Sequence, residues 1–318
     1  MRPGARKLSL YQVSTLKPYE LSARHIFVLM NSLQDTSLSF IGCGVMAEAI
    51  IGGLLRRELV TSAQIIGSHP RPARREELQR KYGIGVVESN AQAAKSGPTT
   101  ASDGPARKSS IVILAVKPQR LSTIFNELRG QLQDEQLVLS IVAGAAIEML
   151  ASELSHPLLV RAMPNTPAQI GQGITAWTAT PEVGDAQLAQ VRALLGALGQ
   201  EMYVERERMI DMATALSATG PTYIFLVMEA LIDAGVHMGF SRHIAQELVL
   251  QTMLGSVLFA KESHKHPAEL RNMVTSPGGT SAAAIYEMEK GGLRTVFSKA
   301  VWAAFQRAVA LGRREKVG

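Results

Sequence analysis

The pattern of apolar and polar positions changes once along the chain, near residue 206. Before that point, short apolar runs of strand length alternate with segments that have helical spacing. After it, every apolar segment has helical spacing. Strands that alternate with helices are typical of a parallel sheet with helices on both faces. We therefore predict an α/β protein, with a Rossmann-type doubly wound parallel sheet over residues 37–206 and an all-α domain over 207–318. Residues 1–36 are expected to be a disordered extension.

The individual elements follow from the same pattern. The predicted strands are 37–41, 64–67, 84–87, 111–116, 137–142, 157–160, 173–179 and 201–204. The predicted helices are 48–57, a short one from Asn90, 120–128, 185–198, 210–218, 222–238, 242–260, one from Ala282, and 292–311. Gly220-Pro221 should break one helix and start the next, because proline is tolerated only in a first turn. Residues 96–110 have the composition of an exposed loop insertion.

The first predicted strand leads directly into a glycine turn, Gly42-Cys-Gly44-Val-Met-Ala47. A G-x-G-x-x-A turn between a strand and a helix lets the backbone approach a pyrophosphate, and the small Ala47 lets the helix pack against the strand. The positive end of the helix attracts the phosphates. This order of elements favours a dinucleotide site over a purely structural turn.

The end of the second predicted strand indicates which dinucleotide is preferred. An NAD enzyme places a carboxylate there to bind the ribose 2′-hydroxyl. This chain has Ser68, His69 and Arg71 instead, followed by Arg74 and Arg75. Guanidinium groups bind phosphate, so we expect NADP(H) to be preferred, with NAD(H) possible. The alternative is that Arg74 and Arg75 only decorate an exposed helix.

A second glycine-rich stretch, Val274-Thr-Ser-Pro-Gly-Gly-Thr-Ser281, precedes an apolar helical segment. Pro277 ends what comes before it, and Gly278 and Gly279 permit positive φ angles and close approach of a ligand. Thr280 or Ser281 can then cap the helix that starts at Ala282. Free N–H groups at a helix start suit a small anion such as a carboxylate. The alternative is a tight loop between two helices.

Composition and charge narrow the possible partners. The 318 residues carry a net charge of +6, but aromatics are 5% and scattered, so we expect no nucleic-acid partner. The single cysteine, Cys43, excludes a disulfide framework and a Cys-rich metal site, and the histidines show no metal-ligand spacing. The apolar run 213–240 is interrupted by Gly220-Pro221, Glu229 and Asp233, so no membrane span is expected. We expect a cytoplasmic protein, or an organellar one if the basic residues 1–29 are a transit peptide.

The segment 222–238 is apolar on nearly every face of the predicted helix. Such a helix must be buried all round, and the short domain that contains it buries only a limited fraction of its surface. A partner subunit that covers the helix is therefore expected.

Several of these motifs together resemble one known family. The stretch 274–281 is similar to the signature of pyrroline-5-carboxylate reductases, which usually have threonine where this chain has Ser281. Ala115-Val-Lys-Pro118, Arg161-Ala-Met-Pro-Asn-Thr-Pro167 and the segment 215–223 resemble the same family. The resemblance extends from Leu38 to Gly312 and implies reduction of the C=N bond of Δ1-pyrroline-5-carboxylate to L-proline. It also implies a homodimer, with a higher assembly such as a decamer left open.

The resemblance and the motifs assign roles to individual residues. The expected catalytic residues are Ser281, Thr280 and Lys117. The expected cofactor-binding residues are Ile41, Gly42, Cys43, Gly44, Val45, Met46, Ser68, His69, Arg71, Asn90, Ala115, Val116, Lys117, Pro118 and Ala143. The expected substrate-binding residues are Glu207, Ser276, Gly278, Gly279, Thr280 and Ser281. No metal ligand is expected.

Some residues depart from the family pattern or have a second interpretation. Met273 stands where some relatives have a polar residue, and Ala218-Thr219 replaces a usual Gly-Ser. Lys117 is otherwise a solvated strand end. Two other functions stay open, namely an NADP-dependent oxidoreductase acting on another cyclic imine or a 3-hydroxy acid, and a non-catalytic nucleotide-binding paralogue.

Overall fold

The computed structural model describes residues 32–95 and 110–312. Of the predicted extension 1–36, residues 1–31 lie outside this range, as do residues 96–109 of the insertion. Within 32–36, Leu33 is fully buried in the core of the sheet. The chain forms two compact units. The sheet unit contains the described residues up to Ala218 and those from Arg307 onward, and the helical unit is Thr219–Gln306.

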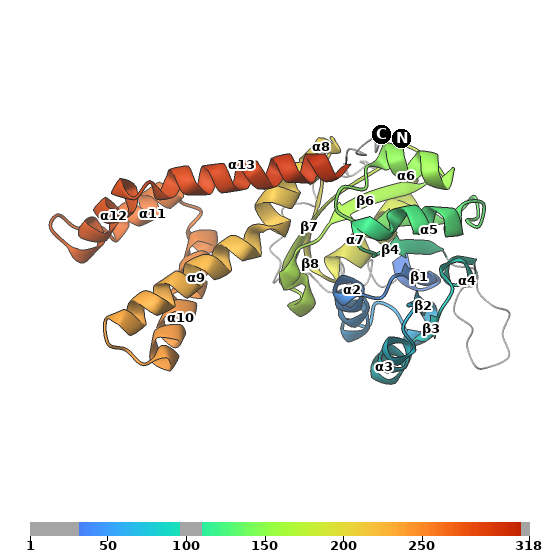
Figure 1. Cartoon of the computed structure of the whole chain (residues 1–318), viewed down its shortest axis with the longest axis horizontal. Helices are drawn as coiled ribbons and strands as arrows, with labels where there is room; N and C mark the ends of the chain where they lie inside the picture. The colour runs from blue at the N-terminus through green and yellow to red at the C-terminus, as the bar shows by residue number, and fades with distance from the viewer. Residues whose placement is uncertain (1–31, 96–109, 313–318) are drawn as a thin grey trace, which may run out of the picture. The chain divides into compact units, whose positions relative to one another are not determined.

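The sheet unit is built on eight strands in the order β3-β2-β1-β4-β5-β6-β7-β8 (Figure 1). The strands are β1 (Leu38–Ile41), β2 (Ile65–Ser68), β3 (Gly85–Val87), β4 (Ile111–Leu114), β5 (Leu137–Ser140), β6 (Leu159–Met163), β7 (Gly173–Ala179) and β8 (Gly199–Tyr203). Neighbours are parallel from β3 across to β6, as the alternating pattern predicts. The pair β6–β7 is antiparallel, so the sheet is not parallel throughout, and β8 follows β7 in parallel.

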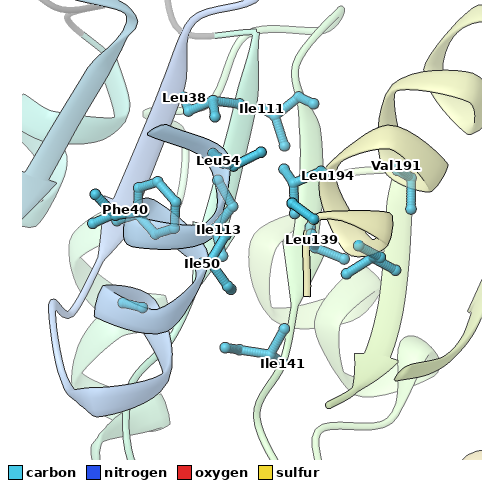
Figure 2. Packing of buried hydrophobic residues seen from close by; sticks show 14 of the residues in the cluster. Leu38, Phe40, Ile50, Leu54, Ile111, Ile113, Leu139, Ile141, Val191 and Leu194 are labelled. Carbon is cyan, nitrogen blue, oxygen red and sulfur yellow. The ribbon is translucent and has the colours of Figure 1, made fainter. Parts of the chain in front are cut away.

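The alternation of side chains along the central strands produces two separate cores. Phe40, Ile113 and Leu139 point to one face, where they pack with residues of α2 (Val45–Arg56) and α7 (Asp185–Gly196) (Figure 2). Ile41 and Val112, each next to one of these residues in sequence, point to the opposite face. They pack there with residues of α4 (Asn90–Lys95), α5 (Leu121–Leu128) and α6 (Ile147–Leu154). A sheet covered on both faces explains why these strands read as continuous apolar runs.

Within its described residues, the sheet unit contains two α-helices that were not among the predicted elements. Its helices are α2 (Val45–Arg56), α3 (Pro72–Tyr82), α4 (Asn90–Lys95), α5 (Leu121–Leu128), α6 (Ile147–Leu154), α7 (Asp185–Gly196) and α8 (Arg208–Ala213), with short 3₁₀ turns at Ser62–Gln64, Pro118–Arg120 and Thr166–Ile170. Neither α3 nor α6 was predicted. The segment of α3 is almost entirely polar and buries only Leu78, so it has no apolar stripe, although Pro72 starts it and the left-handed Gly83 ends it.

The helical unit contains α9 (Gly220–His237), α10 (Arg242–Ser263), α11 (Pro267–Met273), α12 (Thr280–Lys290) and the first part of α13 (Leu293–Gly312). Helices α9 and α10 pack closely at Gly235. A Cβ added to Gly235 would lie only 2.9 Å from the Cβ of Ala245. These two residues are the only buried ones in Thr219–Gln306, a range that the structure describes completely. The helical unit therefore has almost no core of its own.

The segment that leads into α9 corrects one prediction. A π-helical turn, Thr214–Ala218, follows α8, and α9 starts at Gly220, so residues 208–237 form a helical stretch of 30 residues. Among the described residues, this stretch alone is long and apolar enough to cross a membrane, and 6% of its most apolar window is buried. The expectation that no run reaches this length was wrong, because Glu229 and Asp233 are too few to lower the mean hydropathy. Length and composition alone remain weak grounds for a membrane span.

Candidate functional site

The glycine turn after β1 has the shape that a pyrophosphate requires. Gly42 has a φ of +87°, and a Cβ there would lie 2.6 Å from Cγ1 of Val116, so the turn needs glycine. Gly44 is the N-cap of α2, its backbone is extended, and no side chain caps the helix. A Cβ added to Gly44 would meet nothing within 4 Å, so this backbone is open to an approaching group. Open N–H groups at the start of a twelve-residue helix fit the phosphates of a dinucleotide.

The side chains of this turn differ in what they can contact. Ile41 and Cys43 are fully buried, and Cys43 packs so closely on β2 that a Cβ on Gly67 would lie 2.4 Å from its Sγ. Burial raises the pKa of the Cys43 thiol to about 12, so it stays protonated and unreactive. Val45 is 65% exposed at the first position of α2, and Met46 packs partly into the core. Only the backbone is therefore open to a ligand at positions 41 and 43.

Ser68, at the end of β2, is hydrogen-bonded to the backbone of the glycine turn. Its backbone carbonyl accepts from Cys43 N–H at 3.1 Å, and its Oγ accepts from Gly42 N–H at 3.2 Å. The same Oγ lies 3.2 Å from the carbonyl of Phe40 and 2.5 Å from Oδ1 of Asn90. Ser68 is fully buried, so protein groups take up its hydroxyl in this structure. Ser68 and Asn90 thus lie beside the predicted cofactor site and bond to each other.

The loop between β2 and α3 carries the predicted 2′-phosphate residues. Nδ1 of His69 accepts from the N–H of Arg71 at 3.2 Å. Partial burial, and then the charges of Arg71, Arg74 and Arg75, lower the pKa of His69, so its ring is neutral at pH 7. Arg75 donates to the carbonyls of His69 and Pro70, both at 2.9 Å. Within the described residues, the Arg71 guanidinium makes no hydrogen bond or ion pair, which leaves its fork open to an anion.

The ends of β4 and β5 lie on the same side of the sheet as the glycine turn, because β4 pairs with β1 and β5 pairs with β4. Ala115 N–H donates to the carbonyl of Ile41 at 2.9 Å, and Lys117 is the exposed N-cap of the following 3₁₀ turn. A shallow pocket opens beside this edge, lined by Pro118, Leu121, Ser122, Phe125, Ala143, Gly144, Met149 and Leu311. The topology therefore places all the predicted cofactor residues near the carboxyl ends of β1, β2, β4 and β5 and the start of α4, the edge where open α/β sheets bind ligands.

Glu207, a predicted substrate residue, is the N-cap of α8 and takes part in an ion cluster. Its Oε1 accepts from Nη1 of Arg161 at 2.7 Å and from the N–H of Ile147 at 2.8 Å. Arg161 is buried within β6, and its Nη2 also donates to Asp211 at 2.5 Å. In the sequence, Arg161 is marked only as the first residue of the motif 161–167. Its position in an otherwise apolar strand was a signal that it needs buried acidic partners.

The second predicted site, the signature loop, lies in the helical unit. Gly278 has a φ of +72°, which favours glycine, and a Cβ on Gly279 would lie 3.2 Å from the carbonyl oxygen of Ser276, so the chain packs closely there. Helix α12 begins at Thr280 with Gly279 as its N-cap and no side-chain cap. The prediction that Thr280 or Ser281 caps a helix starting at Ala282 was wrong, because the extended Gly279 already makes the transition. Neither hydroxyl makes a hydrogen bond within the described residues, so both are available at the first turn.

In the described parts of the chain, no group of three or more His, Cys, Asp or Glu side chains is placed to hold a metal ion. What the structure does provide is a set of backbone donors and single cationic side chains. This inventory suits anionic groups such as phosphates in the sheet unit and a carboxylate at the signature loop.

Comparisons with known proteins match separate families to the sheet region and to the helical region of the chain. The family model for pyrroline-5-carboxylate reductase dimerisation matches residues 207–311, and the model for coenzyme F420-dependent NADP oxidoreductases matches residues 37–144. Pyrroline-5-carboxylate reductases of Synechocystis and of Pseudomonas aeruginosa are each 40% identical to the chain, covering 87% of it and 98% and 97% of their own lengths.

Two solved structures extend the comparison to the fold. The pyrroline carboxylate reductase of Plasmodium falciparum, with NADP bound, has a TM-score of 0.77 at 29% identity and covers 87% of this chain and 98% of its own. The pyrroline-5-carboxylate reductase of Coxiella burnetii has a TM-score of 0.76 at 33% identity and covers 88% and 99%. The similarity runs through both units and both predicted sites, and the chain belongs to the pyrroline-5-carboxylate reductase family.

Proposed function

We propose that this protein reduces the C=N bond of Δ1-pyrroline-5-carboxylate to give L-proline, with NADPH as the preferred reductant and NADH as a possible one. The observation that carries the proposal is the presence of two anion-binding glycine loops in one chain of this family. The turn at Gly42 and Gly44 suits a dinucleotide, and the loop at Gly278 and Gly279 suits a small carboxylate.

The substrate's carboxylate would be held by the N–H groups at the start of α12. Gly279 leaves this backbone without a side-chain cap, and the first-turn donors need a partner. Thr280 and Ser281 present hydroxyls on the same turn. The hydroxyl of Ser281 would hydrogen-bond to the ring nitrogen and fix the orientation of the imine.

When bound, the nicotinamide would supply a hydride to the imine carbon of the substrate. The imine nitrogen would take a proton from solvent, relayed by the Ser281 hydroxyl. The protein contributes position, because a correctly oriented acceptor avoids much of the entropic cost of the encounter. Lys117, at the exposed edge beside Pro118, would place positive charge near the anionic reactants. Glu207 would act by holding Arg161 and the start of α6 in place.

The preference for NADPH would come from the loop after β2. No carboxylate follows β2 where an NAD enzyme has one, and the fork of Arg71 is open to an anion. The NADP bound in the Plasmodium relative and the match to an NADP oxidoreductase model support this preference.

The helical unit would assemble into a homodimer. Its apolar side chains are largely exposed within the chain, as at Phe225, which is 57% exposed, and Leu226, which is 66% exposed. Exposed apolar surface on this scale is typical of an interface. The match of residues 207–311 to a dimerisation model supports the proposal, and an assembly of several dimers would be an extension of it. We place the protein in the cytoplasm, or in an organelle if residues 1–29 direct it there.

The test is the oxidation of NADPH and of NADH, followed by absorbance, by the purified protein with and without pyrroline-5-carboxylate. The variant Ser281→Ala should lower kcat/KM by about a hundredfold, since it removes a hydrogen bond to the reacting ring. Ser256→Ala is the matched control, because that hydroxyl donates to the carbonyl of Thr252 within α10 at 2.7 Å. Nucleotide binding without turnover would support the non-catalytic paralogue and refute the reductase.

A further inference from the structure

A cluster of charged groups joins α2, α3 and the glycine turn. Glu48, on α2, forms an ion pair with Nη2 of Arg74 on α3. The other oxygen of the same carboxylate accepts from Nζ of Lys81 at 2.7 Å and from the hydroxyl of Tyr82 at 2.9 Å. Nε of Arg74 lies 3.4 Å from the carbonyl of Cys43, inside the turn. One carboxylate thus connects two helices and, through Arg74, the phosphate-binding backbone.

Each of the three guanidinium nitrogens of Arg74 has a protein partner. Nη1 pairs with Glu77 at 2.8 Å, Nη2 with Glu48, and Nε with the Cys43 carbonyl. Its side chain is 15% exposed, and that of Glu48 is 19% exposed. Arg74 follows Arg71 by one helical turn, but it is not an additional phosphate ligand in this arrangement. Its position instead fixes where the first turn of α3 lies relative to the glycine turn.

The first turn of α3 carries the group that the proposed function needs for the 2′-phosphate. Arg71 is the N-cap of α3, and its N–H is bonded to His69 in the preceding loop. A displacement of this turn would move Arg71 relative to the β-strands on which the glycine turn is built. Discrimination between phosphorylated and unphosphorylated ribose is therefore sensitive to what anchors α3.

We infer that Glu48 and Arg74 are positioning residues for cofactor discrimination, acting through α3 and Arg71 without touching the cofactor. The inference rests on the proposed preference for NADP(H). The effect of the position of α3 can be separated from the effect of the charges on Glu48 and Arg74. Glu48→Gln removes a negative charge, whereas Arg74→Lys keeps the positive charge but cannot bond Glu48, Glu77 and Cys43 together.

The experiment measures binding of two probes to the full-length protein by isothermal titration calorimetry. The probes are adenosine 2′,5′-bisphosphate and adenosine 5′-monophosphate, which differ only in the 2′-phosphate. We expect both Glu48→Gln and Arg74→Lys to lower the ratio of their affinities by about fivefold, the size typical of coupled contacts. With saturating NADPH and pyrroline-5-carboxylate, kcat should stay within about twofold, because the reacting groups lie elsewhere.

Glu77→Gln is the matched control, since it removes a partner of Arg74 that lies on the same helix and leaves the bridge to α2 intact. It should not change the ratio. A charge effect alone would raise the ratio in Glu48→Gln and leave Arg74→Lys unchanged, and that result would overturn the inference. So would an unchanged ratio in both variants when the wild-type protein prefers the bisphosphate. A wild-type protein without that preference would remove the NADP(H) proposal as well, whatever its turnover.

Discussion

The two units of this chain differ in how far their apolar side chains are buried. In the sheet unit, residues such as Phe40 and Leu139 are fully buried between the sheet and its helices. In the helical unit, only Gly235 and Ala245 are buried, while Phe225, Leu226 and many similar side chains face outward. Since burial of apolar surface is the main favourable contribution to folding, the sheet unit can be stable alone and the helical unit needs a cover. Apolar side chains therefore form a core in the sheet unit, and we propose that they form an interface in the helical unit.

The largest effect should come from a charge on the outward face of α9. Leu226→Glu should convert the proposed dimer to monomers and lower activity at least tenfold, because an interface with twofold symmetry receives the charge twice, at a cost of about 4 kcal/mol or more. Light scattering coupled to size-exclusion chromatography measures the change in mass. Glu229→Gln, an exposed position on the same helix, should leave both properties unchanged. A Leu226→Glu protein that keeps its mass would show that α9 is not part of the interface.

A cavity in the sheet unit should have a smaller effect of a different kind. Leu139→Ala, at a fully buried position on β5, should lower the free energy of unfolding by about 3 kcal/mol. The loss should be the same at low and high protein concentration, since this core lies within one chain. Urea unfolding at two concentrations separates the two units, because stability that comes from association changes with concentration. A loss at Leu139 that depends on concentration would contradict the distinction.

The smallest effect concerns the polar contact between α2 and α3. Burial of Glu48 opposes its ionisation, but hydrogen bonds from Lys81, Arg74 and Tyr82 outweigh it and lower its pKa from 4.5 to about 2. A carboxyl with a lowered pKa contributes stability above its unfolded pKa, and the contribution is lost as the pH falls from 4.5 toward 2. Glu48→Gln should therefore be less stable than the wild type by about 1 kcal/mol at neutral pH.

The difference in free energy of unfolding between the wild type and Glu48→Gln should shrink as the pH falls from 4.5 toward 2. Urea unfolding at neutral pH and near pH 3.5 measures it, about one unit below the ordinary glutamate value. Glu77→Gln is again the comparison, because Glu77 is 46% exposed and is bonded within its own helix. A difference at Glu48 that does not depend on pH would show that the contact contributes through packing and not through charge.

Much of the sheet unit could be predicted because its rules are local. Continuous apolar runs identified β1, β4 and β5, and the glycine turn between β1 and α2 lies where the motif placed it. Helix α3 was missed because its exposed polar surface gives no periodic signal, and its Pro72 and Gly83 were not weighed as start and stop signals. The antiparallel pair β6–β7 was missed because strand direction depends on how the chain returns to the sheet, which side-chain patterns do not encode.

For the candidate sites, the positions of the glycine loops could be predicted from the sequence, but the partners of the charged side chains could not. Motifs placed the two glycine loops correctly, since each needs a positive φ or a close approach that only glycine allows. The partners of charged side chains were not predictable, because they join residues far apart in sequence. Glu48 with Arg74, and Arg161 with Glu207 and Asp211, are examples. The sequence therefore predicted where the glycine turns lie, but not the ion pairs between distant residues.

The contact between Gly144 and Leu311 has a consequence for how the protein is made. Gly144 follows β5 at the ligand edge, and a Cβ there would lie 2.8 Å from the backbone of Leu311, at the end of α13. The nucleotide-binding unit is thus interrupted in the chain by the whole helical unit and is completed by residues from Arg307 onward. During synthesis, the pocket beside Gly144 cannot be completed until residue 311 has left the ribosome. A ribosome stalled inside α12 would carry a folded sheet that still lacks one wall of its pocket.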